Sequence, residues 1–275
     1  MSTDRKSIAQ IKKEFAEAKE GSLEELFAQY AMDERSGVKA VLNSYRKKQE
    51  KLAKERVRLE EMRSYEHRYE RYGYVCGIDE AGRGPLAGPV VAGAVILPED
   101  CEILWLNDSK QLSEKKREAL YDEIMEKALA VSVGMASPAR IDEINILQAT
   151  YEAMREAIAG LKIRPQVLLN DAVKIPQVEI SQVPIIRGDA KSLSIAAASV
   201  IAKVTRDRLM KDYDKLMPEY GFAKHKGYGS AAHMEAIRKF GSSRSTDRAL
   251  SKTSYESGGE TGQNCLKVRN MKNRI

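Results

Sequence analysis

The first 72 residues carry their hydrophobic side chains at helical spacing. Between Ile8 and Phe15 the apolar positions recur every three or four residues, which predicts a first helix. Ser22-Leu-Glu-Glu25 has the form of a capping box and predicts the start of a second, short helix. From Val38 to Tyr72 the pattern resumes and becomes strongly charged, as in an exposed helix with one apolar face. We therefore expect an amino-terminal helical extension over residues 1–72.

From residue 73 onward, short β-rich runs alternate with helical stretches. The β-rich runs predict strands at residues 74–79, 90–97, 131–135, 167–170 and 183–186. Helical spacing predicts helices at residues 113–130, 141–161 (as one helix or a pair) and 192–217. The last helix is packed with alanine in its first half, which suits close contact with a sheet. This order predicts an α/β domain over residues 73–240, with a mixed β-sheet flanked by helices on both faces.

Composition limits the class of protein. Hydrophobic residues make up 43% of the 275 residues, enough for a core, so wholesale disorder is excluded. No apolar run approaches the roughly 18 residues of a membrane span, and the amino-terminal stretch is too polar for a signal peptide. Cys76, Cys101 and Cys265 are too widely spaced for a metal knuckle, and their odd number argues against a disulfide framework. We expect a cytoplasmic protein without membrane contact.

The excess of positive charge lies outside the central region. Of the 46 basic and 40 acidic residues, residues 1–72 hold 17 and 14, and residues 241–275 hold 7 and 3, giving net charges of +3 and +4. The remaining 22 basic and 23 acidic residues leave residues 73–240 at −1. Basic flanks around a near-neutral body are typical of polyanion-binding proteins, although solvated helices of mixed charge give the same composition.

Acidic residues stand where the predicted strands end. Asp79 with Glu80, then Asp171, then Asp189, each come at or just after such an end, and in an open sheet these ends converge on one edge. Clustered carboxylates repel one another unless a cation neutralises them, and oxygen ligands without Cys or His favour Mg²⁺ or Mn²⁺. Two such ions can activate a water and stabilise the leaving oxygen of a phosphodiester. Each residue alone could be a turn former, and Asp189 a helix cap, so only the set predicts a metal site.

A loop rich in glycine and proline follows the first two carboxylates. Residues 81–89 read Ala-Gly-Arg-Gly-Pro-Leu-Ala-Gly-Pro. Glycines on both sides of Arg83 expose backbone groups for close approach to a ligand, and the arginine can reach a phosphate. An ordinary turn between two strands is the alternative. The loop is neither GxxxxGK[ST] nor GxGxxG, so the sequence gives no support for a nucleotide-binding fold.

Five sequence blocks occur in the order of one known family. Residues 77–92 read Gly-Ile-Asp-Glu-Ala-Gly-Arg-Gly-Pro-Leu-Ala-Gly-Pro-Val-Val-Ala and closely resemble the signature of type-2 ribonuclease H, ribonuclease HII. Four further blocks match in the family's order, at residues 107–113, 188–191, 196–207 and 225–229. The resemblance covers residues 74–240 and implies a ribonuclease H-like fold.

The resemblance also implies an activity and its carboxylates. The family cleaves the RNA strand of RNA–DNA hybrids and cuts at single ribonucleotides embedded in duplex DNA, leaving 3′-hydroxyl and 5′-phosphate ends. By resemblance, Asp79, Glu80, Asp171 and Asp189 are the catalytic, metal-binding carboxylates, with Mn²⁺ or Mg²⁺ as cofactor and two ions during catalysis. Water would attack in line at the phosphate 5′ to the ribonucleotide, so no side-chain nucleophile is needed.

Further residues are implied to bind the substrate. Gly82, Arg83 and Gly84 match the family loop that detects the ribose 2′-hydroxyl, mainly through backbone groups, and this hydroxyl is what separates RNA from DNA. Tyr228 matches the tyrosine that stacks on the next, deoxyribose, sugar. The remaining candidates, phosphate-binding or site-supporting groups, are Ser109, Lys110, Lys191 and Lys203.

Two other interpretations stay open at this stage. One is a different metal-dependent nuclease on the same fold, such as an exonuclease or a resolvase, and the other is a non-catalytic hybrid-binding protein. The expected partners are RNA–DNA hybrids and ribonucleotide-containing duplex DNA. We expect a monomer, and the sequence names no protein partner.

The two ends of the chain depart from the signature. Residues 1–72 lie outside it, and we expect their lysines and arginines to contact phosphates of the duplex. Residues 243–250 read Ser-Arg-Ser-Thr-Asp-Arg-Ala-Leu where the family commonly has Pro-x-His-Arg-x-Ser-Phe. With permitted codons, a neighbouring frame can encode Pro-Ile-His-Arg-Ser-Ser-Phe. This predicts that residues 243–275 are a frameshifted end and that residues 241–275 form a disordered, atypical tail.

Overall fold

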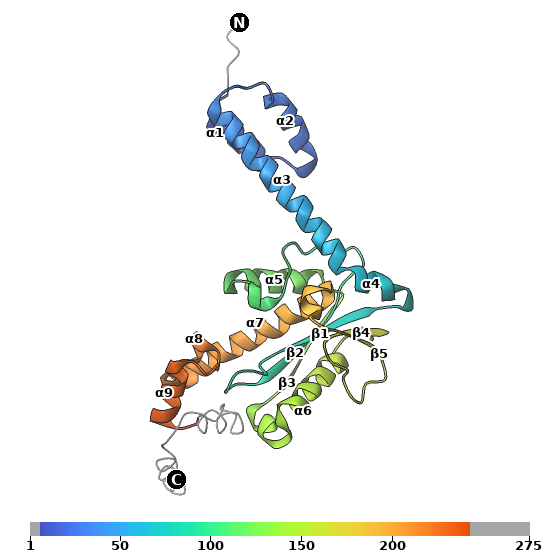
Figure 1. The fold of residues 1–275 in the computed structure, drawn as a ribbon, viewed down its shortest axis with the longest axis vertical. Helices are drawn as coiled ribbons and strands as arrows, with labels where there is room; N and C mark the ends of the chain where they lie inside the picture. Colours follow the sequence, from blue (N-terminus) through green and yellow to red (C-terminus); the bar gives the residue numbers. More distant parts are fainter. Residues whose placement is uncertain (1–5, 243–275) are drawn as a thin grey trace. The chain divides into compact units, whose positions relative to one another are not determined.

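The structure, a computed structural model, describes residues 6–242 (Figure 1). The contacts divide the chain into two compact units, residues 1–60 and residues 61–275. This division falls before the boundary that the sequence predicts at residue 72. The predicted frameshifted end, residues 243–275, lies outside the described residues, and so does nearly all of the predicted disordered tail.

The first unit is a small helical assembly. Its elements are α1 (Ile8–Glu17), the 3-10 turn η1 (Glu20–Ser22), α2 (Leu23–Tyr30) and most of α3 (Ser36–Met62). The helical spacing of the apolar residues brings Ile11, Phe15, Tyr30, Val38 and Leu42 together as a buried cluster. The sequence therefore predicted both the helices and their buried face correctly.

The capping box predicted at Ser22 is wrong. Ser22 ends η1 with a helical backbone, and its hydroxyl donates backwards to the carbonyl of Lys19 at 2.9 Å. A capping box needs an extended residue at the cap, and the structure has one at Ser7 instead. There the Ser7 hydroxyl accepts from the backbone N–H of Gln10, and the Gln10 side chain accepts from the N–H of Ser7.

The second unit is built on a five-stranded mixed sheet with the order β3-β2-β1-β4-β5. The strands are β1 (Val75–Ala81), β2 (Val90–Ile96), β3 (Ala130–Ala136), β4 (Val167–Asp171) and β5 (Ser181–Ile185). β1, β2 and β3 form the antiparallel meander, while β4 and β5 run parallel to β1. The predicted mixed sheet is confirmed, strand by strand.

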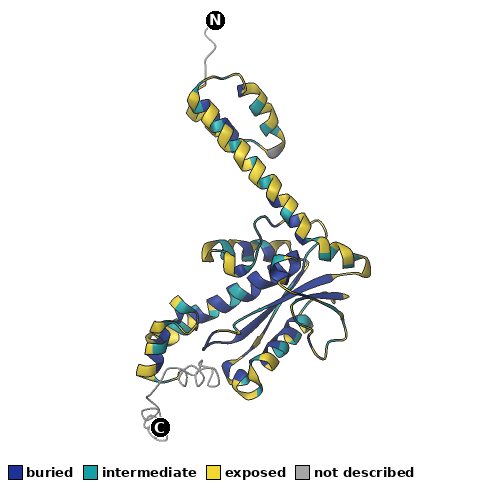
Figure 2. Ribbon diagram, in the orientation of Figure 1, coloured by how far each residue is buried: buried dark blue, intermediate teal, exposed yellow. Residues whose placement is uncertain are grey.

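One face of the sheet is covered by α7 (Leu193–Leu216), which begins at its N-cap Ser192. The approach is close because the sheet carries glycines there. A Cβ at Gly77 would lie 2.1 Å from the backbone carbon of Ser194, and one at Gly93 would lie 2.5 Å from the carbonyl oxygen of Ala198. The alanine-rich half of α7 completes this contact, and it is buried together with the sheet (Figure 2).

The opposite face is covered by α6 (Pro138–Ala159), which packs on the alternate side chains of β1 and β2. The helix is kinked at Asn145, whose φ is 69°. Gly134 in β3 allows the close approach here, since a Cβ would lie 2.1 Å from the carbonyl oxygen of Ala153. Helices on both faces are thus confirmed.

Shorter elements complete the second unit. Those near the sheet are α4 (Ser64–Tyr69), η2 (Glu70–Tyr72), η3 (Ser109–Gln111), α5 (Glu114–Lys127) and η4 (Gly188–Ala190). Tyr65 and Tyr69 of α4 pack against a cluster that includes Val75 and Leu169, so the predicted apolar face of this stretch is used within the second unit. Within residues 6–242, no helix is both long and apolar enough to cross a membrane.

Three elements after α7 were not predicted from the sequence. They are η5 (Pro218–Tyr220), α8 (Phe222–His225) and α9 (Ala231–Phe240). The first two have only three and four residues, too few for a clear period. They pack through Tyr220 and Phe222, which stack at 5.5 Å. Their cluster includes Met210 of α7, which fixes these elements against the end of the long helix.

Candidate active site

The predicted carboxylates gather at one edge of the sheet. Ile78 of β1 pairs with Asn170 of β4, so the next residues, Asp79 and Asp171, lie on adjacent parallel strands at the same level. Glu80 follows Asp79 directly. The backbone N–H of Gly188 donates to Oδ1 of Asp171 at 2.7 Å, and this bond brings η4, with Asp189, to the same edge.

Asp79 is the most deeply placed of these carboxylates, with only 6% of its surface exposed. Burial raises its pKa well above the usual value, and the charges of Glu80 and Asp171 raise it further, while a hydrogen bond from Ser199 works in the opposite direction. The physical meaning is that negative charge is crowded here without full compensation by the protein.

Glu80 and Asp189 share this environment. Burial is the main cause that raises the pKa of Glu80; Asp171 raises it too, and Arg83 opposes the shift through an ion pair at 3.2 Å. For Asp189, burial again raises the pKa first, followed by the charges of Asp108 and Asp171. Asp189 is not the helix cap that was its alternative role, because Ser192 caps α7.

Lys110 brings positive charge toward the carboxylates from η3. Partial burial lowers its pKa, but Asp108, and then Asp79, Asp189 and Asp171, raise it by more, so the pKa lies above its usual value. The side chain remains exposed. An exposed cation within the field of the carboxylates can meet an incoming phosphate.

Two serines connect η3 to Asp79. Oγ of Ser109 lies 2.9 Å from Oγ of Ser199, and Ser199 hydrogen-bonds the carboxylate of Asp79. An ionised carboxylate only accepts, so Ser199 donates to Asp79 and Ser109 donates to Ser199. Ser109 is 3% exposed, and it therefore supports the carboxylate from behind.

The loop after Glu80 turns tightly over Arg206 of α7. Gly82 has φ 107°, a conformation that favours glycine, and a Cβ there would lie 2.4 Å from the carbonyl oxygen of Pro89. Arg83 and Gly84 are exposed at the turn. The loop thus presents its backbone next to the carboxylates, as the sequence predicted for a segment that contacts a ligand.

Tyr228 lies beside this loop, although 144 residues separate it from Gly84 in the sequence. A Cβ on Gly84 would lie 3.8 Å from Cε1 of Tyr228. The tyrosine is 45% exposed, and Nζ of Lys203 lies 6.0 Å from the centre of its ring. The structure therefore brings the glycine loop and the tyrosine together as one exposed surface.

One further predicted site residue is Lys191, and the sequence reasoning missed three buried residues. Lys191 follows η4 and is exposed. The sequence reasoning gave no role to Ser199, Arg206 or His233, all of which are buried. Their signal was available in part, because Ser199, Lys203 and Arg206 follow helical spacing along α7.

The four carboxylates lie near one another, but they do not form a complete set of metal ligands. Within residues 6–242, no group of three or more His, Cys, Asp or Glu side chains is arranged to hold a metal ion. The donor set nevertheless fits hard divalent cations, because it consists of carboxylate oxygens whose mutual repulsion a cation would relieve.

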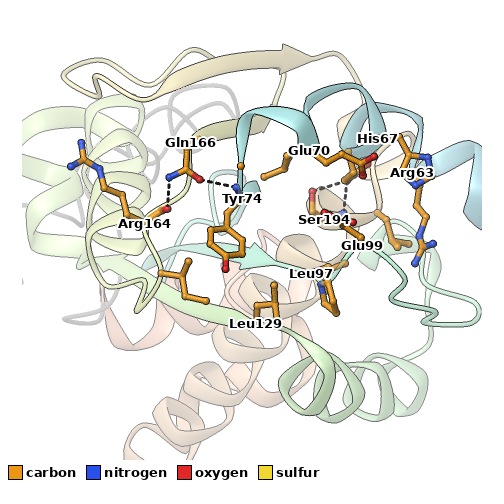
Figure 3. A pocket seen from close by; sticks show the side chains of 16 residues that line it. Arg63, His67, Glu70, Tyr74, Leu97, Glu99, Leu129, Arg164, Gln166 and Ser194 are labelled. Carbon is orange, nitrogen blue, oxygen red and sulfur yellow. Dashed lines mark hydrogen bonds between the residues drawn. The ribbon is translucent and has the colours of Figure 1, made fainter.

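A cavity of about 710 Å³ lies elsewhere, at the opposite edge of the sheet (Figure 3). It is lined by residues from α4, from the start of β1 and from the start of α7, where Glu66 accepts from the backbone N–H of Ser194 at 2.9 Å and from its hydroxyl at 2.7 Å. β1 begins at this edge, whereas Asp79 lies toward its other end. The cavity is therefore separate from the carboxylates.

Comparison with solved structures defines the class of protein. The structure is similar to ribonuclease H2 from Pyrococcus horikoshii, with a TM-score of 0.55 and 29% identity, covering 64% of this chain and 93% of that one. It is also similar to a structure of the PCNA:RNase HII complex from Archaeoglobus fulgidus, with a TM-score of 0.54 and 26% identity over 64% and 94% of the two chains. The fold is that of the ribonuclease H-like nucleases.

Sequence comparison then gives the family. The family model described as Ribonuclease HII matches residues 76–257, and the model described as Ribonuclease HII N-terminal domain matches residues 7–70. The chain is 63% identical to a ribonuclease HII from Lachnoclostridium phytofermentans over 236 residues, which cover 86% of this chain and 93% of the relative. It is 54% identical to one from Bacillus cytotoxicus over 220 residues, covering 79% and 85%.

The chain belongs to the ribonuclease HII family and is an endoribonuclease. The resemblance of the motifs is thereby confirmed, and the expectation of an enzyme is confirmed over that of a non-catalytic binding protein. The match of residues 7–70 adds what the motifs did not contain, because it shows that the helical extension is also a known part of this family.

Proposed function

We propose that this chain hydrolyses the RNA strand of RNA–DNA hybrids and cuts 5′ of ribonucleotides embedded in duplex DNA, leaving 3′-hydroxyl and 5′-phosphate ends. The observation that carries the proposal is the crowding of Asp79, Glu80, Asp171 and Asp189 at one edge of the sheet. Membership of the ribonuclease HII family supports the same reaction.

The four carboxylates would hold divalent cations, Mg²⁺ or Mn²⁺. When bound, the cations supply the activation of the attacking water and the stabilisation of the leaving oxygen. The protein's part is to aim the carboxylates. Ser199, supported by Ser109, orients Asp79, and the backbone N–H of Gly188 orients Asp171.

The substrate would be read by the surface that Gly82, Arg83, Gly84 and Tyr228 form. The backbone of the glycine loop is free to meet a 2′-hydroxyl, which can both donate and accept. The exposed ring of Tyr228 can stack on the sugar that follows. Lys110 and Lys191, both exposed, would contact the phosphates beside the scissile bond.

The first unit would add affinity for the duplex without reading its sequence. Residues 1–60 contain 14 basic and 11 acidic side chains, a net charge of +3. Contacts between basic side chains and phosphates position a duplex in this way. We further propose that the chain acts as a monomer in the cytoplasm.

A cleavage assay with matched duplexes tests the proposal. One duplex is DNA with a single ribonucleotide, the second is the all-DNA duplex of the same sequence, and the third is an RNA–DNA hybrid. We expect the first and third to be cut in Mg²⁺ or Mn²⁺, the second to remain intact, and chelator to stop cleavage. Equal cleavage of the all-DNA duplex would instead identify another metal-dependent phosphodiesterase on the same fold.

A further inference from the structure

A buried arginine joins the two elements proposed to read the sugars. Arg206 of α7 is 1% exposed, and its guanidinium donates to three backbone carbonyls. Nε donates to Pro89 and Nη2 donates to Ala87, both at 2.9 Å, in the loop that begins at Gly82. Nη1 donates to Lys226 at 2.9 Å, two residues before Tyr228. One rigid side chain therefore connects the glycine loop to the tyrosine segment.

The two segments also touch each other above this arginine. The backbone N–H of Leu86 donates to the carbonyl of Gly227 at 2.9 Å. A Cβ on Gly227 would lie 2.1 Å from the carbonyl oxygen of Ala87, and one on Gly82 would lie 2.5 Å from Nε of Arg206. The spacing between the loop and the tyrosine segment is therefore fixed by backbone contacts that leave no room for adjustment.

The chemistry of Arg206 fits this role. Burial lowers the pKa of its guanidinium, which shows that the charge is held at a cost. An apolar side chain would pack in this helix without that cost. A planar guanidinium donates from three separate nitrogens in fixed directions, whereas the three donors of a lysine ammonium all sit on one nitrogen. Lys226, one of its acceptors, has a left-handed backbone with φ 51°, a conformation that needs support from its surroundings.

Two stacked histidines hold Tyr228 from the other side. The rings of His225 and His233 stack with their centres 4.5 Å apart. His225 accepts from the N–H of Gly227 through Nδ1, at 3.2 Å, so its Nε2 carries the proton and donates to the carbonyl of Tyr220 at 2.8 Å. Nδ1 of His233 donates to the carbonyl of Tyr228 at 3.0 Å. The backbone of Tyr228 is thus held by α9 while Arg206 holds the residues before it.

We propose that Arg206, with His233, is a positioning residue that sets the spacing between the 2′-hydroxyl-reading loop and Tyr228, and so determines the preference for an RNA-to-DNA junction over a uniform hybrid. The proposal rests on the proposed function of these two elements. A single ribonucleotide in DNA must place its ribose at the loop and the following deoxyribose at Tyr228. A uniform hybrid offers a ribose at both places, so it gains less from correct spacing.

The variant Arg206→Lys tests this in the full-length protein. We expect the ratio of kcat/KM for the single-ribonucleotide duplex to kcat/KM for the hybrid to fall about tenfold, as the removal of charge-assisted hydrogen bonds implies. Arg208→Lys is the matched control, because Arg208 lies on the same helix, pairs with Glu118 and stacks on Tyr121 at an exposed site. Its ratio should equal that of the wild type.

A double-mutant cycle separates positioning from a general structural effect. In a Tyr228→Ala background, Arg206→Lys should leave the ratio unchanged, because the ring whose place it sets is gone. A purely structural arginine would lower both activities in proportion in either background, and that outcome would overturn the proposal.

A second pair of variants covers the case in which Arg206→Lys does not fold. His233→Leu removes the donor to the carbonyl of Tyr228 and should lower the same ratio, whereas His233→Asn keeps a donor at this position and should restore it. An unchanged ratio in His233→Leu would overturn the proposal. If the wild type cuts neither ribonucleotide substrate, the proposed function fails; if it cuts both and the variants keep its ratio, only the present inference fails.

Discussion

At the scale of single residues, the active-site edge is a place where function and stability oppose each other. Asp79 is buried beside Glu80 and Asp171, and burial and like charge both favour its protonated form. A structure selected for stability alone would place an amide or an apolar side chain here. The crowding supports our proposal that a cation joins the carboxylates during the reaction.

The first prediction is that Asp79→Asn abolishes cleavage while the fold persists. Removal of an outer partner of a metal ligand typically costs 10- to 100-fold, so removal of a direct ligand should lower kcat/KM by more than about 100-fold. Steady-state cleavage of the single-ribonucleotide duplex measures this, with circular dichroism to verify folding. Asp122→Asn, at a carboxylate that is 78% exposed on α5, is the control and should keep full activity. Normal turnover by a folded Asp79→Asn protein would remove Asp79 from the site.

The second prediction is that the same Asp79→Asn variant is more stable than the wild type without metal. The pKa of Asp79 is higher in the folded state than in the unfolded chain. As pH rises above about 4, the unfolded chain therefore releases this proton first. The free energy of unfolding falls over this range, until the pH passes the raised pKa of the folded state. In chelator, the variant should melt several degrees higher at pH 8, with a smaller gain at pH 5. Thermal unfolding at both pH values checks the sign, and a lower melting temperature for the variant at pH 8 would contradict it.

At the scale of elements, the site depends on how closely α7 approaches the sheet. Glycines at Gly77 and Gly93 let the helix backbone rest directly on β1 and β2. This contact brings Ser199 to Asp79 and carries Arg206 under the glycine loop. The geometry of the carboxylates is therefore set by residues packed between the helix and the sheet.

The third prediction is that Gly77→Ala destabilises the second unit and impairs catalysis together. Its Cβ would lie 2.1 Å from the backbone carbon of Ser194, so helix and strand must separate, at a cost of about 1–3 kcal/mol. Urea unfolding followed by circular dichroism gives the free energy of unfolding. Gly21→Ala, where a Cβ meets nothing within 4 Å, is the control. Wild-type stability in Gly77→Ala would show that the helix can shift without cost.

At the scale of the whole molecule, both units carry a net positive charge, but all four carboxylates belong to the second unit. Residues 1–60 have a net charge of +3, and the remaining 32 basic and 29 acidic residues give residues 61–275 a net charge of +3 as well. The residues just after this division belong to the second unit by their contacts, because Glu66 accepts hydrogen bonds from Ser194 and Tyr65 packs near Val75. A deletion that tests the first unit must therefore stop at residue 60.

The fourth prediction concerns that deletion. A chain of residues 61–275 should bind an RNA–DNA hybrid more weakly. The slope of log binding constant against log salt concentration should also become flatter, by about 0.9 for each phosphate that the first unit neutralises in the full chain. Binding isotherms at several salt concentrations measure the slope, and thermal unfolding verifies that the second unit persists. The choice of cleavage position should not change. An equal slope for both proteins would show that the first unit does not contact phosphates.

The sequence by itself determined the order and type of the long elements and the identity of the family, because periodicity and motifs are local properties of the chain. It also indicated the four carboxylates, since each stands at or just after the end of a predicted strand. It predicted a capping box at Ser22 that the structure lacks, and it missed α8 and α9; the four-residue α8 depends on its neighbours for stability. Only the tertiary structure decided which distant residues meet: Tyr228 beside Gly84, Ser199 beneath Asp79, and Arg206 between two loops. The physical reason is that such contacts depend on how closely helix and sheet pack in space, which no local pattern encodes.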